Sequence, residues 1–133
     1  MNDREFLTAL ETLNLPHDDF PHRAHVRMAW LYLREHGWSE GIIKIRATIQ
    51  HYAAAHGARR KYHETITLFW ARLVANANAQ TPDAADFQEF IAQHPELLDG
   101  NLLSKFYSKE RLQSEEARLA WLEPDLKLLP VIA

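Results

Sequence analysis

Histidine is the residue of this chain best suited to chemistry: the sequence has 8 histidines and no cysteine. A neutral imidazole can accept a hydrogen bond, take up a proton near neutral pH or coordinate a metal ion. His22 and His25 are spaced as i and i+3, and His63 directly precedes Glu64. Imidazole and carboxylate are ligands that suit zinc or iron. The two pairs would form a His/carboxylate site if the fold brings them together.

The elements that must position these side chains are helices. Apolar residues recur with the helical period along most of the chain. Glycine is scarce, at 4 residues, while alanine and leucine are common, which favours helix over sheet. We expect an all-α fold, a single-domain bundle of four to six helices with an irregular C-terminal strap. The expected helices cover about residues 3–13, 21–36, 40–56, 60–77 and 82–94, followed by short helical pieces at 102–107 and after Ser108 and Ser114.

Short connections between these helices predict where the histidines gather. Gly37 can take a left-handed conformation at the end of the second helix, and Gly57 ends the third. Consecutive helices joined by short loops run antiparallel. The second and fourth helices therefore begin at the end of the bundle where the third finishes. That end would collect His17, His22, His25, His51, His56, His63 and Glu64, with His25 and His63 at the same depth, about four residues into their helices.

Three interpretations of this histidine-rich end stay open. In the first, His22, His25, His63 and Glu64 hold a divalent metal, zinc or iron. In the second, the same end binds a small polar or anionic ligand without metal. In the third, the side chains form a hydrogen-bond network that satisfies buried polar groups. The spacing matches no established zinc motif such as HExxH, so the sequence does not decide among them.

Individual roles follow from residue type. His63, Glu64 and Tyr62 are the candidate catalytic residues: Glu64 as a metal ligand or as a base on bound water, and Tyr62 as a proton donor. Arg27 and His51 are the candidate ligand-binding residues. Arg27 stands out because it interrupts an apolar helix and can bind an anion. The cofactor stays unknown, a divalent metal (zinc or iron) being one open interpretation, and the sequence does not decide whether the protein is an enzyme.

Bulk properties narrow the class of protein. The 133 residues, 47% apolar and 25% charged, fit one globular domain over residues 1–133. A net charge of −3 disfavours nucleic-acid binding. The densest apolar stretch, Val26 to Leu33, contains Arg27 and is too short to span a membrane, and the N-terminal residues do not form a secretory signal. We therefore expect a cytoplasmic protein that contacts neither membrane nor nucleic acid, with homo-oligomerisation left open.

An alternative function uses the opposite end of the chain. The tail from Leu122 to Ala133 is dense in apolar residues and contains two prolines, which predicts an extended strap. In this interpretation the protein is a non-catalytic interaction module. Its tail would then carry function and its histidine cluster would be structural.

Two motifs resemble a known family. The segments F-P-H-R-A-H-V-R-M-A-W-L-Y-L (residues 20–33) and K-Y-H-E-T-I-T (residues 61–67) are similar to a family of small uncharacterised bacterial proteins. The segments H-P-E-L-L-D (residues 94–99) and Y-S-K-E-R-L (residues 107–112) fit the same pattern, so the resemblance covers most of the chain. It implies a bacterial, single-domain protein and supplies no mechanism. Family members often have Asp where this chain has Ala24, so that carboxylate is missing here.

Overall fold

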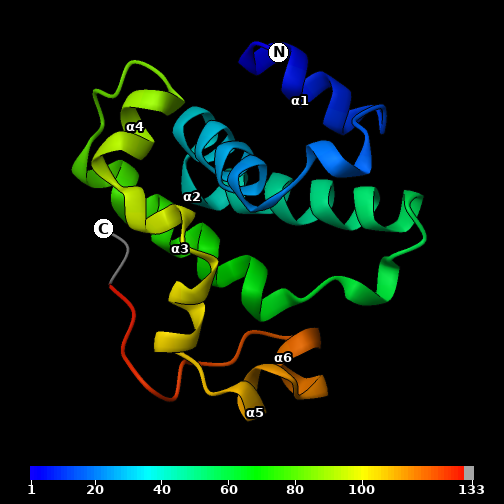
Figure 1. Ribbon diagram of the computed structural model, residues 1–133, viewed down its shortest axis with the longest axis vertical. Coiled ribbons are helices and arrows are strands. Elements are labelled where there is room, and N and C mark those ends of the chain that lie inside the picture. The colour runs from blue at the N-terminus through cyan, green and yellow to red at the C-terminus, as the bar shows by residue number, and fades with distance from the viewer. Residues whose placement is uncertain (131–133) are drawn as a thin grey trace. The chain divides into compact units, whose positions relative to one another are not determined.

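The structure is a computed structural model that describes residues 1–130, and its fold is all-α (Figure 1). The described residues form six α-helices and four short 3-10 helices, with no strand among them. The prediction of an all-α chain is confirmed. Across these residues, no helix combines the length and hydrophobicity needed to cross a bilayer.

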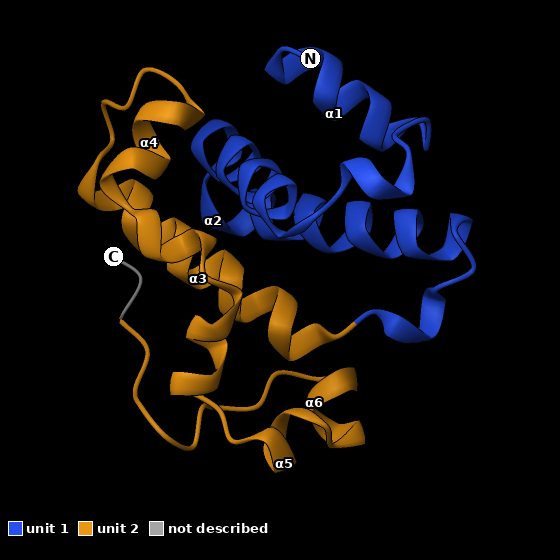
Figure 2. Cartoon of the chain, viewed as in Figure 1, with its two compact units in different colours: residues 1–62 blue, residues 63–133 orange. Residues whose placement is uncertain are grey.

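The chain divides into two compact units, residues 1–62 and 63–133, which meet in sequence at Tyr62 and His63 (Figure 2). The expected single domain over the whole chain stays a prediction. Unit 1 contains α1 (Asp3–Glu11), η1 (His17–Asp19), α2 (His22–Ala55) and η2 (Arg59–Lys61). Unit 2 contains α3 (Glu64–Gln80), α4 (Phe87–Gln93), η3 (Pro95–Leu98), η4 (Gly100–Lys105), α5 (Lys109–Leu112) and α6 (Glu115–Leu119).

Helix α2 is a hairpin of two helical arms, residues 22–36 and 38–55, which join at Gly37 without a loop. Gly37 has φ 75° and ψ −175°, a conformation that is essentially restricted to glycine because a Cβ would clash. The positive φ agrees with the prediction for Gly37, but ψ −175° places the residue outside the left-handed helical conformation that was predicted. The arms fold back on each other, since the Tyr32 hydroxyl lies 3.2 Å from Thr48 Oγ1.

A second glycine lets the two arms approach closely. A Cβ at Gly41 would lie 3.2 Å from the carbonyl oxygen of Tyr32 and 3.3 Å from Leu33 Cα. Both atoms belong to the backbone of the first arm and cannot rotate away. Gly37 thus reverses the chain, and Gly41 makes room for the returning arm.

The first arm of α2 is buried on nearly every side. All six residues from Met28 to Leu33 are buried, and Val26 is 1% exposed. This agrees with the sequence, in which apolar residues surround the whole helix axis rather than one stripe. The first arm is therefore the buried arm of the hairpin. Because the second arm runs back along it, side chains at the start of the first arm lie near side chains at the end of the second arm.

Capping side chains explain several helix boundaries in unit 2. Ser108 and Ser114 begin α5 and α6 as predicted, each accepting a backbone N–H on its hydroxyl. The expected helix start at residue 82 is wrong, because Thr81 ends α3 and donates its hydroxyl to the Ala77 carbonyl. Asp86 begins α4 instead, since its carboxylate accepts the Glu89 N–H.

The predicted strap is present in unit 2, from Ala120 to Pro130, with Val131 to Ala133 outside the described residues. The buried Thr65 hydroxyl donates to the Ala120 carbonyl at 2.8 Å and accepts the Leu122 N–H at 3.1 Å. The Tyr107 hydroxyl donates to the Leu122 carbonyl at 2.6 Å. Further along, the Leu126 N–H donates to the Phe106 carbonyl. These bonds give the extended backbone the partners that a helix would have supplied.

Candidate functional site

The residues predicted to form one site belong to both units. His22, His25, Arg27, His51 and Tyr62 lie in unit 1, and His63 and Glu64 begin unit 2.

His63 caps a helix instead of lying four residues inside it, which corrects the predicted depth. Residues 59–61 form a separate 3-10 turn, His63 itself is extended, and α3 begins at Glu64. The His63 Nδ1 atom accepts the Ile66 N–H at 3.1 Å, and Nε2 lies 2.8 Å from the Leu112 carbonyl oxygen. Since a carbonyl can only accept, Nε2 carries the hydrogen and the imidazole is neutral. Both ring nitrogens are thus used within unit 2, and neither remains for a metal ion.

Glu64 occupies the first turn of α3 and is 8% exposed. A helix N-terminus favours an anionic side chain there. Within residues 1–130, however, no three or more His, Cys, Asp or Glu side chains are arranged to hold a metal ion. The metal interpretation therefore finds no ligand set in the described part of the chain.

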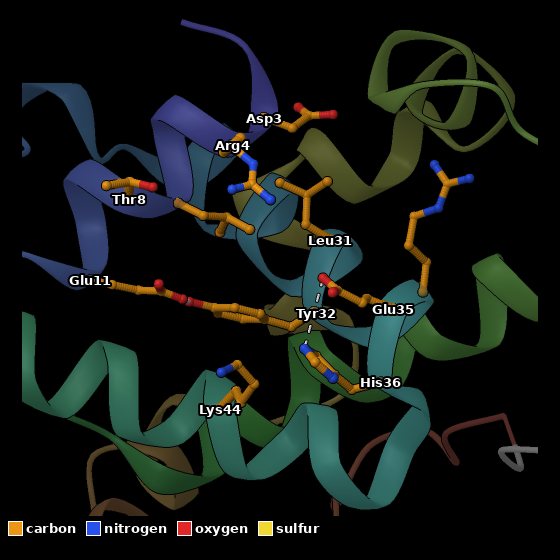
Figure 3. A pocket seen from close by; sticks show the side chains of 11 residues that line it. Asp3, Arg4, Thr8, Glu11, Leu31, Tyr32, Glu35, His36 and Lys44 are labelled. Carbon is orange, nitrogen blue, oxygen red and sulfur yellow. Dashed lines mark hydrogen bonds and ion pairs between the residues drawn. The ribbon is translucent and has the colours of Figure 1, made fainter.

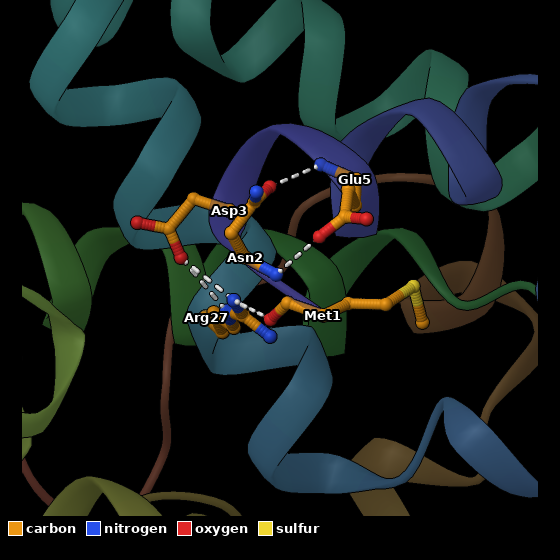
Figure 4. Close-up of polar contacts among 5 residues, drawn as sticks. All are labelled: Met1, Asn2, Asp3, Glu5 and Arg27. Carbon is orange, nitrogen blue, oxygen red and sulfur yellow. Dashed lines mark hydrogen bonds and ion pairs between the residues drawn. The ribbon is translucent and has the colours of Figure 1, made fainter.

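Arg27 contacts the start of the chain (Figure 4). Its Nε and Nη2 atoms donate to Asp3 Oδ1 at 3.1 and 2.7 Å, and Nη2 also donates to the Met1 carbonyl at 3.1 Å. Its guanidinium lies 4.6 Å from the centre of the Phe6 ring. The arginine that interrupts the apolar arm thus connects α2 to α1. These contacts give the side chain a structural role, and its predicted role in ligand binding stays a prediction.

Unit 1 contains a cavity of about 200 Å³ where the two arms of α2 end, and we call it the imidazole pocket. Its lining includes two of the predicted residues, His25 and Tyr62. The lining has three imidazoles, one lysine, two tyrosines and four apolar side chains; its members are His17, Phe20, His25, Ile49, Tyr52, Ala53, His56, Ala58, Lys61 and Tyr62. The predicted meeting of the start of residues 22–36 with the end of the returning helix is therefore present within unit 1.

His25 is held against the floor of the imidazole pocket. Its ring stacks on Phe20 with 3.7 Å between centroids and 15° between planes. Its Nδ1 atom donates to the Pro21 carbonyl at 3.0 Å. Burial lowers the pKa of His25 below 6.5, the Pro21 carbonyl opposes this effect, and the neighbouring His22 adds a smaller lowering. The ring is therefore neutral at pH 7, with a hydrogen on Nδ1 and a lone pair on Nε2.

His56 repeats this arrangement at the end of α2. Its Nδ1 atom donates to the Tyr52 carbonyl at 3.0 Å, and its ring lies 4.2 Å from the Tyr52 ring centre. The Tyr52 hydroxyl donates to the Leu15 carbonyl at 2.8 Å, and burial raises its pKa, so it stays protonated. The His17 ring lies 6.0 Å from that of His56. In their neutral forms, His25 and His56 both present Nε2 as a hydrogen-bond acceptor.

The sequence analysis placed both His51 and His56 at this end but selected His51 as the candidate ligand-binding residue, although the helical period distinguishes the two. Tyr52 is 5% exposed and faces the pocket, and His56 is four residues further, on the same face of α2. His51 is one residue before Tyr52, about 100° around the helix, and is exposed outside the pocket. Lys61 also lines the pocket, although it was not among the candidate site residues. His22 lies near His25 in the first turn but does not line the pocket.

Comparison of this chain with models of protein families, with curated proteins and with solved structures finds no match. The geometry of the site therefore carries the functional argument by itself.

Proposed function

We propose that this protein binds a small organic ligand in the imidazole pocket, through a hydrogen bond that the ligand donates to Nε2 of His25. The observation that carries the proposal is the use of Nδ1 by His25 and His56 for backbone carbonyls. An imidazole held in this way directs an acceptor, rather than a donor, at a ligand when it is neutral, as His25 is. The ligand must therefore supply an O–H or N–H group.

The dimensions of the imidazole pocket restrict the ligand further. A cavity of about 200 Å³ is small compared with the roughly 300–1,000 Å³ of common ligand sites, so it suits a single ring. Phe20, Ile49 and Tyr52 offer apolar contact to the body of such a ring. Lys61 and Tyr62 bring an ammonium and a phenol to the same cavity. The best-matched ligand is a ring with one polar edge.

The same arrangement supports proton transfer. An imidazole with a free lone pair and a lowered pKa is a general base that is unprotonated at neutral pH. A bound ligand with an acidic O–H group would give its proton to His25. This proton transfer requires that the ligand first binds in the imidazole pocket.

A titration followed by nitrogen NMR of the histidine rings tests the proposal. Phenol supplies a ring and a donor, and toluene supplies the ring alone. We expect phenol to bind saturably and to shift the Nε2 resonance of His25, while toluene leaves that resonance in place. Equal effects of phenol and toluene would overturn the proposed hydrogen bond.

Matched variants locate the binding. His25→Phe keeps an aromatic ring beside Phe20 but removes the acceptor, so it should weaken phenol binding about tenfold, the value of one well-made hydrogen bond. His51→Phe makes the same change at an exposed residue outside the imidazole pocket and should leave affinity unchanged. Phenol binding that survives His25→Phe would place the ligand elsewhere.

A second candidate, an interaction module, is favoured by the surface of the strap. Leu126 is 58% exposed and Leu128 is 86% exposed. The backbone of this segment is nevertheless fixed, because the Leu126 N–H donates to the Phe106 carbonyl. Exposed leucines on an ordered segment favour contact with a partner. The pair variant Leu126→Asp/Leu128→Asp should abolish any self-association measured by sedimentation. An unchanged sedimentation profile from an associated wild type would exclude this surface.

A further inference from the structure

A second and larger cavity lies between α1 and α2 within unit 1, with a volume of about 580 Å³, and we call it the α1–α2 pocket (Figure 3). Its polar lining includes Arg4 and Glu11 from α1 and Tyr32 and Lys44 from the two arms of α2. None of these residues belongs to the imidazole pocket or to the site predicted from sequence.

The carboxylates that line the α1–α2 pocket already have partners from the protein. Asp3 accepts two N–H groups of Arg27, and Glu11 accepts the Tyr32 hydroxyl at 2.5 Å. Glu35 Oε2 lies 3.8 Å from His36 Nε2. These carboxylates therefore have fewer oxygen atoms available to accept a hydrogen bond from a ligand than their number indicates.

Tyr32 is also fully used. It donates its hydroxyl hydrogen to Glu11, so the Thr48 hydroxyl at 3.2 Å must be the donor in their contact. Burial, reinforced by the bond to Glu11, raises the pKa of Tyr32 well above 10. The phenol stays protonated and connects α1 to both arms of α2. It has no hydrogen left for a ligand.

Arg4 and Lys44 are two cations that line the α1–α2 pocket and come from different helical elements, α1 and the second arm of α2. Within residues 1–130, neither lies within ion-pair distance of a carboxylate. Lys44 Nζ lies 5.6 Å from the Tyr32 ring centre. Figure 3 shows Arg4 and Lys44 extending toward the Glu11–Tyr32 pair from α1 and from the second arm of α2. Guanidinium and ammonium groups with unused N–H donors are the usual partners of an oxyanion.

We infer that the α1–α2 pocket binds a small organic oxyanion, a phosphate monoester or a carboxylate, through Arg4 and Lys44. Leu7 and Leu31 also line the cavity and give the organic part apolar contact. The volume lies within the range of small-molecule sites and exceeds what inorganic phosphate alone would fill. The site is independent of the imidazole pocket.

Calorimetric titration with phenyl phosphate, benzoate and benzyl alcohol tests the inference on the full chain. We expect phenyl phosphate or benzoate to bind and benzyl alcohol not to bind at this site, and the tighter of the two anions identifies the natural head group. Arg4→Gln and Lys44→Gln should each weaken binding about tenfold by removing a charge-assisted hydrogen bond. Lys109→Gln removes a charge outside the pocket and should have no effect. Failure of both anions to bind, or binding unaffected by both pocket variants, would overturn the inference.

A variant of opposite sign separates a charge effect from damage to the fold. Glu11→Gln keeps an acceptor for the Tyr32 hydroxyl but removes a negative charge from the α1–α2 pocket, so it should tighten oxyanion binding. Weaker binding in Glu11→Gln would contradict the inference. His25→Phe should leave oxyanion binding unchanged, so that this site and the imidazole pocket can fail separately.

Discussion

His63 Nε2 donates a hydrogen bond to the carbonyl oxygen of Leu112 at 2.8 Å, across 49 positions of the chain. The same ring accepts the Ile66 N–H on Nδ1 and so begins α3. One imidazole thus joins the start of α3 to the end of α5.

His63→Ala should therefore destabilise the protein. It leaves the Ile66 N–H and the Leu112 carbonyl without their partner, and the lost cap and hydrogen bond together contribute about 1–3 kcal/mol. His63→Asn retains a side-chain acceptor for the cap and should recover part of the loss. Urea denaturation measures both, and equal stability of His63→Ala and wild type would show that the bonds contribute nothing.

Thr65→Val should loosen the strap at nearly constant side-chain shape. The hydroxyl that binds both the Ala120 carbonyl and the Leu122 N–H is lost, at a cost of about 1–3 kcal/mol for buried groups left unpaired. Thr65→Ser keeps the hydroxyl and is the matched control. Hydrogen exchange at the Leu122 amide should accelerate in the valine variant alone; protection equal to wild type there would remove Thr65 as the anchor.

Gly37→Ala should cost about 1–3 kcal/mol, because a Cβ strains a residue with φ 75° and ψ −175°. Gly100→Ala is the control, since Gly100 has no positive φ and a Cβ there meets no atom within 4 Å. Thermal unfolding should separate the two variants clearly. A Gly37→Ala protein as stable as Gly100→Ala would mean that the hairpin tolerates another conformation at this residue.

Stability should decline on acidification, partly through His25. Burial lowers the folded-state pKa below the ordinary 6.5, so the unfolded chain binds more protons in between. The contribution is complete above pH 6.5 and is lost as the pH falls from there through the folded-state pKa. In His25→Phe the free energy of unfolding should change less between pH 7.5 and pH 5 than in wild type. An identical slope in both proteins would assign the acid sensitivity to other groups.

Asp3→Asn should have a small effect, which makes it a useful contrast. The Arg27–Asp3 contact is partly solvated, with 24% and 47% of the two side chains exposed, so the pair contributes less than about 1 kcal/mol. Added salt should weaken the difference between variant and wild type further. A loss of several kcal/mol in chemical denaturation would show that this contact holds α1 far more firmly than its exposure indicates.

The fold was predictable where the signals are local. Helical periodicity predicted the all-α architecture. Gly37 predicted the end of the first arm of α2, and Ser108 and Ser114 predicted the starts of two helices. Each of these depends on residues within one or two turns of the chain. Thr81 misled because the sequence Thr-Pro-Asp favours a helix start, whereas the structure uses the Thr81 hydroxyl to end α3.

The candidate site was predictable only in part. The hairpin placed His25 near the end of α2, as expected, but the choice between His51 and His56 required knowing that Tyr52 faces the pocket. The role of His63 could not be predicted from the sequence, because its partner is the backbone carbonyl of Leu112. Every residue has such a carbonyl, so the residue type at position 112 does not indicate the bond. The expected grouping of His25 with His63 and Glu64 remains a prediction. The hydrogen bonds of His63 give it a structural role at the start of α3.

The pair Gly37 and Gly41 has a consequence for recognising distant relatives of this chain. Neither residue lines the imidazole pocket or the α1–α2 pocket, and each is required by the backbone: Gly37 by its positive φ, Gly41 by the close approach of the first arm. Pocket residues can change when a relative binds another ligand. The chain reversal at Gly37 and the close approach of the two arms at Gly41 must persist for the hairpin to form. A glycine pair four positions apart, after a helix whose residues 28–33 are all buried, should therefore be retained longer than the pocket histidines.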